Sequence, residues 1–177
     1  MDKKIAILTP VFDDPAKEFN IREIARLTRL NHMTARKYLN QLVKEGLLSK
    51  KEYSLYVGYS ANVMEKSFHN LKLYYNLEKL RKSRLIEDLE VFYEYPVIVL
   101  FGSYAQALDT KESDLDLFVL AAKKKEFPAK KYEKFIQRAI SLHLFSEKEF
   151  PELKMKNPEL VNNICNGIAL SGKLEVA

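Results

Sequence analysis

The sequence of 177 residues has a single cysteine, Cys165. One cysteine excludes an internal disulfide and a zinc site of the Cys-x-x-Cys kind. Because Cys165 lies in a late apolar segment, we expect its side chain to be buried. No apolar run approaches the roughly 20 residues that a membrane-spanning helix needs, and no internal repeat or low-complexity segment is visible. We therefore expect a globular protein that has no membrane partner.

The composition indicates a chain that can bury a hydrophobic core. Hydrophobic residues make up 47% of the sequence and charged residues 30%. The length allows one domain of average size or two small ones. The first residues, Met-Asp-Lys-Lys, lack the small-residue cleavage site of a signal peptide. A cytoplasmic location is therefore expected.

The net charge of +5 is spread unevenly along the chain. Residues 1–60 carry 11 basic and 7 acidic side chains, residues 61–95 carry 6 of each, and residues 96–177 carry 12 and 11. The excess of basic side chains is therefore N-terminal, and a polyanion is expected to bind in that region.

Two β-branched and aliphatic runs, residues 97–101 and 115–120, have the composition of strands that are buried on both faces. Pro96 starts the first run, where a missing N–H is tolerated. We expect two adjacent core strands. Gly102 and Ser103 follow the first run, and Tyr104 to Ala107 indicates a first helical turn. A glycine lets the backbone approach a ligand closely, and such a turn offers N–H groups and a hydroxyl to a phosphate.

Two aspartates, Asp114 and Asp116, open the second run. The period-two alternation of a strand puts both carboxylates on one face and Leu115 on the other, in the core. Adjacent carboxylates repel each other unless a positive charge lies between them. A divalent cation that bridges to a nucleoside triphosphate is the usual solution, since oxygen ligands suit Mg²⁺.

Together, the Gly-Ser turn, ten intervening residues and the Asp-x-Asp strand resemble the minimal nucleotidyltransferases of the DNA polymerase β-like superfamily. The resemblance implies that Gly102 and Ser103 hold the triphosphate of a nucleotide, with ATP expected, and that Asp114 and Asp116 hold Mg²⁺ or Mn²⁺. The sequence departs from the family pattern in two places. A second glycine often follows the serine by four or five residues, where this chain has Ala107 and Leu108.

The second departure concerns a third carboxylate, which in the family usually lies on a later strand and activates the attacking hydroxyl. The candidate strand, residues 139–145, offers only Ser141 and His143 at its alternating polar positions. His143 could serve as general base or metal ligand, because an imidazole titrates near neutral pH. It could equally be a polar residue on the exposed side of a strand.

The N-terminal region predicts two short helices. Asn20 is placed to cap a helix over residues 21–27, and Asn31 to cap a second helix that Gly46 stops. Residues 47–57 then have the pattern of strand, polar turn and strand. Over roughly residues 1–60 the sequence resembles the winged-helix domains of prokaryotic transcription regulators, and the whole chain resembles an archaeal type of fusion between such a domain and the transferase.

In that resemblance the second helix is the DNA-recognition helix. Its polar face carries the candidate DNA-binding residues Arg36, Lys37, Asn40, Gln41 and Lys44. Double-stranded DNA is the expected partner. Winged helices also serve as plain protein-interaction modules, which is the alternative for this region.

We thus predict a mixed fold of the α+β or α/β class. It comprises a winged helix-turn-helix domain over residues 1–60, a helical connector over 61–95, and a nucleotidyltransferase domain with a small mixed sheet over 96–177. The connector is expected to be helical because it has apolar residues at helical spacing and no Gly or Pro up to Tyr93. Part of the connector surface is expected to pack on the sheet or on a second copy of the chain, as in a homodimer.

The leading functional hypothesis is a Mg²⁺-dependent nucleotidyltransferase that is coupled to a DNA-binding domain. Asp114, Asp116 and His143 are its candidate catalytic residues. The acceptor is open, and one option is a partner protein, because some members of the minimal family transfer AMP to the partner in a toxin–antitoxin pair. The alternatives are a transcription regulator whose degenerate transferase domain senses a nucleotide, and an antitoxin that acts by binding a partner toxin.

Overall fold

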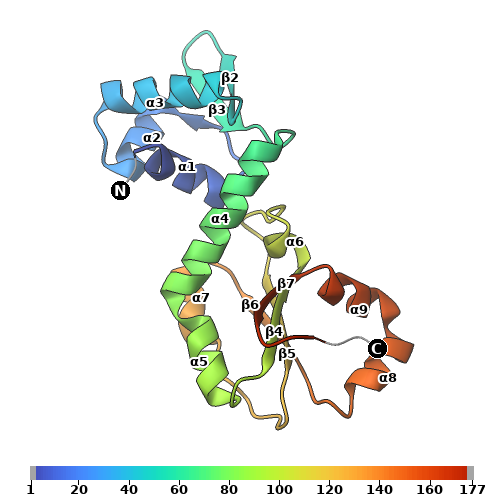
Figure 1. Cartoon of the computed structure of the whole chain (residues 1–177). Coiled ribbons are helices and arrows are strands. Elements are labelled where there is room, and N and C mark those ends of the chain that lie inside the picture. Colours follow the sequence, from blue (N-terminus) through green and yellow to red (C-terminus); the bar gives the residue numbers. More distant parts are fainter. Residues whose placement is uncertain (1–2, 175–177) are drawn as a thin grey trace. The chain divides into compact units, whose positions relative to one another are not determined.

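A computed structural model describes residues 3–174 of the chain. The chain divides into two compact units, Met1–Tyr75 and Asn76–Ala177, which are drawn in Figure 1. The outermost residues of the two predicted terminal domains, 1–2 and 175–177, lie outside the described part.

The N-terminal unit alternates helices with a small antiparallel sheet. Its elements in chain order are α1 (Lys3–Asp13), β1 (Phe19–Asn20), α2 (Ile21–Thr28), α3 (His32–Lys44), β2 (Leu48–Glu52), β3 (Val57–Ala61) and the first turns of α4 (Lys66–Ser83). The strand order in the sheet is β1-β3-β2, with Phe19 opposite Tyr59 and Lys50 also opposite Tyr59. The predicted order of strand, turn and strand is present, but β3 begins at Val57, where the predicted second strand was expected to end, and the two-residue strand β1 was not foreseen.

The two N-terminal helices begin at the predicted caps. The Asn20 side chain accepts a hydrogen bond from the Glu23 N–H, and the Asn31 side chain accepts one from the Thr34 N–H. These bonds satisfy backbone donors that have no partner within the helix. Gly46 follows the end of α3 with a φ of 77°, a conformation that glycine adopts without steric cost. Both cap predictions are therefore confirmed.

The core of this unit is formed by apolar side chains from every one of its helices. Ile7 and Phe12 come from α1, Ile24 from α2, Leu39 from α3 and Phe68 from α4, and all five are buried. Ala35, Leu39 and Leu42 form the buried stripe of α3. The opposite side of α3 is left to polar and charged residues, as the period of the sequence predicts.

The region expected to be a helical connector forms α4 and α5 (Leu85–Phe92). Arg84 separates them because its backbone is left-handed, with a φ of 61°, which ends the helical hydrogen-bond pattern. Leu71 of α4 packs on the N-terminal core, while Leu80 of α4 and Leu85 of α5 belong to the core of the C-terminal unit. Helix α4 therefore contributes to both cores, and α5 contributes to the core of the C-terminal unit.

The C-terminal unit is built on a four-stranded mixed sheet. Its elements after α5 are β4 (Val97–Phe101), α6 (Gly102–Ala105), β5 (Leu115–Leu120), α7 (Lys130–Ile136), β6 (Ile140–Phe145), α8 (Phe150–Lys156), α9 (Pro158–Cys165) and β7 (Ile168–Ser171). The strand order is β6-β5-β4-β7. β4 pairs antiparallel with β5 and β7, and β5 pairs parallel with β6. The predicted adjacency of the two core strands is thus confirmed.

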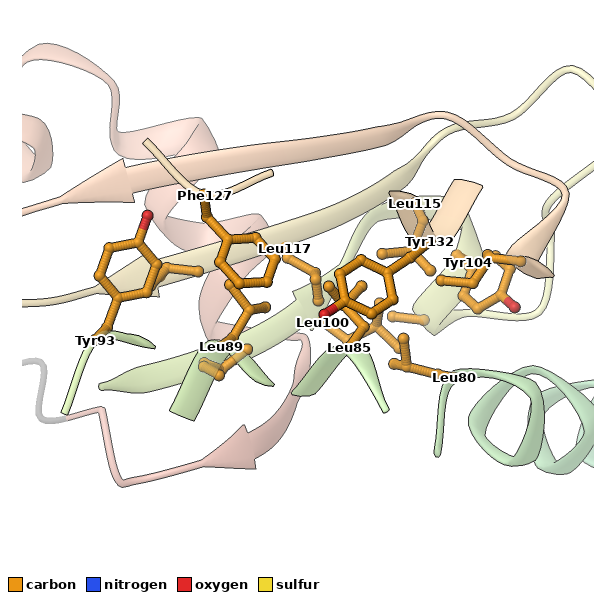
Figure 2. Close-up of a cluster of buried hydrophobic side chains, with 14 of the residues drawn as sticks. Leu80, Leu85, Leu89, Tyr93, Leu100, Tyr104, Leu115, Leu117, Phe127 and Tyr132 are labelled. Carbon is orange, nitrogen blue, oxygen red and sulfur yellow. The ribbon is translucent and has the colours of Figure 1, made fainter. Parts of the chain in front are cut away.

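Helices cover both faces of this sheet (Figure 1). On one face Leu100 and Leu117 pack with Leu85, Leu89 and other side chains of α4, α5 and α7, which Figure 2 shows. On the other face Phe118 packs with residues of α8 and α9. The side chains of the six residues of β5 point alternately to these two faces. A polar side chain at the beginning of β5 can therefore lie only on the face that carries Phe118.

Cys165 is exposed rather than buried, so the prediction for its side chain was wrong. It is the last residue of α9, whose packing face is formed by Val161 and Ile164. The next position along the helix therefore points away from that core. Among the described residues, no helix is both long and apolar enough to cross a membrane.

The start of α8 yields a prediction about acid stability. The ammonium of Lys124 and then the N–H and hydroxyl of Ser146 lower the pKa of the Glu149 carboxyl to about 2. A carboxyl with a lowered pKa in the folded state stabilises it above its unfolded pKa, and this contribution is lost as the pH falls. The free energy of unfolding should therefore decline more steeply between about pH 4.5 and pH 2 in the wild type than in Glu149→Gln.

Acid titrations of the unfolding free energy of both proteins test this expectation. Glu147→Gln is the matched control, because Glu147 is an exposed neighbour, and it should keep the wild-type slope. Equal slopes in the wild type and Glu149→Gln would contradict the assignment.

Candidate active site

The Gly-Ser turn and the Asp-x-Asp strand meet at one end of the C-terminal sheet. Gly102 and Ser103 directly follow β4 and open the short helix α6. Asp114 directly precedes β5, and Asp116 pairs in register with Phe101, the last residue of β4. The hydrogen-bonded strands therefore bring the four residues to the same end of the sheet.

Gly102 lies against the side chain of Asp116. Its φ is 71°, and a Cβ atom built on it would lie 2.6 Å from Asp116 Oδ2. Both the backbone conformation and the available space therefore require glycine at this position. As a result, the backbone of the turn closely approaches the carboxylate.

The third strand adds two polar side chains to the same face. Ser141 is in register with Asp116 on the parallel strand pair β5–β6. Its hydroxyl donates to Asp114 Oδ2 at 3.4 Å. His143 Nε2 lies 3.5 Å from Asp116 Oδ1, and the imidazole ring contacts the edge of Phe101 with 5.1 Å between ring centroids. The structure thus brings His143 to Asp116 and Ser141 to Asp114.

The donor set of this end of the sheet suits a hard cation that also binds an external ligand. Within residues 3–174 no group of three or more His, Cys, Asp or Glu side chains is arranged to hold a metal ion. Two half-exposed or exposed carboxylates can nevertheless supply part of an oxygen coordination sphere, and phosphate and water oxygens can supply the rest. The residues therefore fit a divalent cation that is bound together with a phosphate ligand.

A buried polar cluster lies beside the loop that joins the turn to the aspartates. Asn76, Asp109 and Arg138 are 2%, 1% and 7% exposed. Sequence reasoning missed all three, because a polar residue in a loop or on a helix carries no periodic signal of burial.

The predicted DNA-binding residues of α3 differ in their surroundings. Arg36, Lys37 and Lys44 are exposed. The Asn40 side chain accepts a hydrogen bond from the Tyr59 hydroxyl at 3.1 Å, and the Gln41 amide donates to Glu45 at 3.1 Å. The three basic residues are therefore available to a polyanion, whereas the two amides have protein partners.

The two units also differ in charge. Residues 1–75 carry 13 Lys or Arg and 8 Asp or Glu, whereas residues 76–177 carry 16 of each. The whole net charge of +5 therefore belongs to the N-terminal unit. The hairpin beside α3 adds Lys50 and Lys51, both exposed, which sequence reasoning did not single out.

A family model described as polymerase beta, nucleotidyltransferase matches residues 85–174. The matched stretch begins at α5, contains the whole four-stranded sheet and includes the Gly-Ser turn and both aspartates. No curated protein and no solved structure matches the chain.

Replacement of Gly102 by alanine tests the contact with Asp116. The added Cβ must displace the carboxylate, and the left-handed backbone costs about 1–2 kcal/mol for a residue other than glycine. We expect Gly102→Ala to unfold more easily and to bind Mn²⁺ more weakly than the wild type. Unfolding titrations and Mn²⁺ binding measured by electron paramagnetic resonance provide the two readouts.

Gly172→Ala is the matched control. Gly172 also has a positive φ, 65°, but its added Cβ would meet Val97 and Pro96 rather than a carboxylate. This variant should lose similar stability and keep wild-type Mn²⁺ binding. If both variants bind Mn²⁺ as the wild type does, Gly102 does not control the position of the carboxylate.

Proposed function

The chain belongs to the polymerase beta nucleotidyltransferase family, and from that membership we propose that it transfers a nucleotide from ATP to an acceptor hydroxyl while its N-terminal unit binds duplex DNA. The membership itself indicates nucleotidyl transfer in general. We propose in addition that the nucleotide is ATP, that a metal ion takes part, that the residues have the roles given below, and that the N-terminal unit binds DNA.

In the proposed reaction the Gly-Ser turn holds the nucleotide. The Ser103 hydroxyl and the backbone N–H groups around Gly102 donate hydrogen bonds to the β- and γ-phosphates. Because Gly102 lacks a side chain, the phosphates can approach the backbone closely. The diphosphate is held while the bond between the α- and β-phosphates breaks.

Asp114 and Asp116 would hold Mg²⁺ or Mn²⁺. The cation supplies Lewis-acid stabilisation of the charge that develops on the phosphate oxygens during an in-line displacement. Ser141 donates to Asp114 and thereby helps to fix the orientation of that carboxylate.

His143 is the proposed proton acceptor for the attacking hydroxyl. Its Nε2 lies 3.5 Å from Asp116, on the face of the sheet that carries the two carboxylates. A neutral imidazole can take a proton at physiological pH. In this chain His143 would take the place of the third carboxylate that usually accepts this proton in the family.

The observation that carries the proposal is the contact between Gly102 and Asp116. The residue proposed to bind phosphate packs directly against the residue proposed to bind metal, and a metal-bound nucleotide needs both within reach of a single ligand.

Incubation with ATP labelled at the α-phosphate, Mg²⁺ or Mn²⁺, and a cell extract as the source of acceptors tests the activity. Label that joins a macromolecule supports it, and the absence of transfer with all acceptors contradicts it.

A second candidate is a regulator whose transferase domain binds a nucleotide without transferring it. The observation that favours it is that no group of three metal-binding side chains exists among the described residues. Binding of ATP with Mg²⁺ that is never followed by label transfer would identify this case.

Removal of one carboxylate charge should abolish metal-dependent nucleotide binding. Asp114→Asn and Asp116→Asn keep the shape of the side chain but remove the charge that attracts the cation. We expect at least a tenfold loss of ATP affinity in the presence of Mg²⁺, with no loss of stability, because carboxylate repulsion is relieved. Isothermal titration calorimetry measures the affinity.

Glu112→Gln is the control, because Glu112 is an exposed carboxylate in the same loop. It should bind ATP as tightly as the wild type. Undiminished binding in both aspartate variants would remove the metal assignment.

For the N-terminal unit, three observations support a winged helix that binds DNA. The elements follow the order helix, strand, helix, helix and hairpin; α3 presents Arg36, Lys37 and Lys44 to solvent; and the net positive charge belongs to this unit. Cations on an exposed helix face attract the phosphates of a duplex. Asn40 and Gln41 would need to leave their partners to read bases.

The salt dependence of duplex binding tests this part of the proposal. Replacement of Arg36 and Lys37 together by alanine should weaken binding at least tenfold. It should also flatten the slope of log affinity against log salt by about one to two units, since each phosphate contact contributes about 0.9. Fluorescence anisotropy with a labelled duplex provides both values.

The control variant replaces Lys130 and Lys134, two exposed lysines of the C-terminal unit, by alanine. Its affinity and salt slope should stay near those of the wild type. If both double variants lose affinity equally, the N-terminal unit is not the DNA-binding unit and the protein-interaction alternative replaces it.

A further inference from the structure

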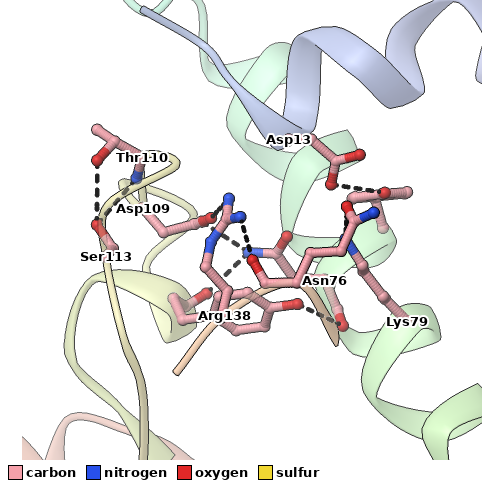
Figure 3. A network of polar contacts seen from close by, with 10 residues as sticks. Asp13, Asn76, Lys79, Asp109, Thr110, Ser113 and Arg138 are labelled. Carbon is pink, nitrogen blue, oxygen red and sulfur yellow. Dashed lines mark hydrogen bonds and ion pairs between the residues drawn. The ribbon is translucent and has the colours of Figure 1, made fainter. Parts of the chain in front are cut away.

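The loop between the Gly-Ser turn and the first aspartate is held from its inside. Its backbone closes on itself, because the Leu108 N–H donates to the Ser103 carbonyl at 2.9 Å. Nearer the aspartate, the Thr110 N–H donates to the Ser113 hydroxyl at 2.9 Å. Between these two contacts lies Asp109, whose side chain turns into the protein (Figure 3).

Asn76 of α4 joins this loop to the turn. One atom, Asn76 Nδ2, donates both to the Tyr104 carbonyl at 3.1 Å and to Asp109 Oδ1 at 2.8 Å. The Tyr104 hydroxyl in turn donates to the Asn76 carbonyl at 3.4 Å. Tyr104 directly follows Ser103, so a single amide group fixes the position of the turn relative to the loop.

Arg138 joins the same loop to the third strand. Its Nη2 lies 3.3 Å from Asp109 Oδ2, and its Nη1 donates to the Gln137 carbonyl at 2.8 Å. Gln137 and Arg138 lie just before β6, which carries Ser141 and His143. The Asp109 carboxylate therefore receives one contact from α4 and another from the segment that leads to β6 (Figure 3).

Such a cluster is poorly explained by stability alone. A buried ion pair loses hydration on folding, and apolar residues of similar volume often stabilise a protein as well or better. A buried network of hydrogen bonds and ion pairs, by contrast, favours one arrangement of the groups that it joins. The groups joined here are the turn, the loop and the start of β6, which bear the proposed phosphate, metal and proton-transfer residues.

The backbone of the loop indicates why this support is needed. Ala107 has a φ of 56°, in a left-handed region that residues with a Cβ rarely adopt. Asn76 and Arg138 donate hydrogen bonds to Asp109, two residues later, and so restrain the chain next to Ala107.

We propose that Asn76 is a positioning residue of the nucleotide site and acts, through Tyr104 and Asp109, on the Gly-Ser turn and the loop that leads to Asp114. It touches neither the nucleotide nor the metal. The inference rests on the proposed function, because positioning matters only if the turn binds the phosphates of a nucleotide.

The test compares Asn76→Ala with Leu80→Ala. Leu80 lies on the same helix and is buried in the core of the same unit, but the hydrogen bonds to Tyr104 and Asp109 come from other residues. We expect Asn76→Ala to weaken the binding of ATP with Mg²⁺ about tenfold, since small misplacements of binding groups have large effects. Leu80→Ala should be destabilised and keep its ATP affinity. Equal losses of affinity in the two variants would overturn the inference.

A double-mutant cycle separates positioning from general loosening. If Asn76 acts through the turn, Asn76→Ala should cost far less affinity in the Ser103→Ala background than in the wild type, because coupled residues are not additive. Full additivity would contradict the proposed route. Should Asn76→Ala fail to fold, Asn76→Ser retains one donor and is tested in its place.

Hydrogen exchange measured without nucleotide tests the positioning role of Asn76 independently of the proposed function. Amides of residues 103–110 should exchange faster in Asn76→Ala than in Leu80→Ala, while those of β4 and β5 should not differ. If the wild type binds no ATP, the proposed function fails, and equal exchange of the loop in the two variants overturns the positioning role as well.

Discussion

The close approach of Gly102 to Asp116 is the contact on which the rest of the site depends. Asp116 Oδ2 lies only 2.6 Å from the position that a Cβ of Gly102 would take. The antiparallel pairing of β4 with β5 places Asp116 opposite the residue before the glycine, so register and packing fix the same contact. His143 lies 3.5 Å from the same carboxylate, and Ser141 donates to Asp114.

Much of this arrangement is predictable from the sequence, for identifiable reasons. The runs that became β4 and β5 contain little but apolar residues, because both faces of the sheet are covered. The two aspartates stand two positions apart, so strand geometry alone puts them on one face. Asn20 and Asn31 act as helix caps through their own side chains, which is a local property that sequence reveals.

The remaining features depend on contacts between distant segments. The burial of Asn76 and Asp109 requires Tyr104 and Arg138, which lie 28 and 62 residues from Asn76 in the chain. The strand β1 has two residues and exists only because β3 lies beside it. Cys165 looked buried because its segment is apolar, but the face on which a helical residue lies is decided by its neighbours in space. The position of His143 beside Asp116 likewise required the parallel register of β5 with β6.

In the proposed function, one metal-bound nucleotide contacts the Gly-Ser turn and the Asp-x-Asp strand together. Nuclear magnetic resonance with ATP and paramagnetic Mn²⁺ tests this most directly, because the ion broadens amide signals in its neighbourhood. Signals of Gly102, Ser103 and residues 114–116 should broaden at low concentrations of Mn²⁺ and ATP, and those of α3 should not. Broadening centred on another part of the chain, or none at these residues, would contradict it.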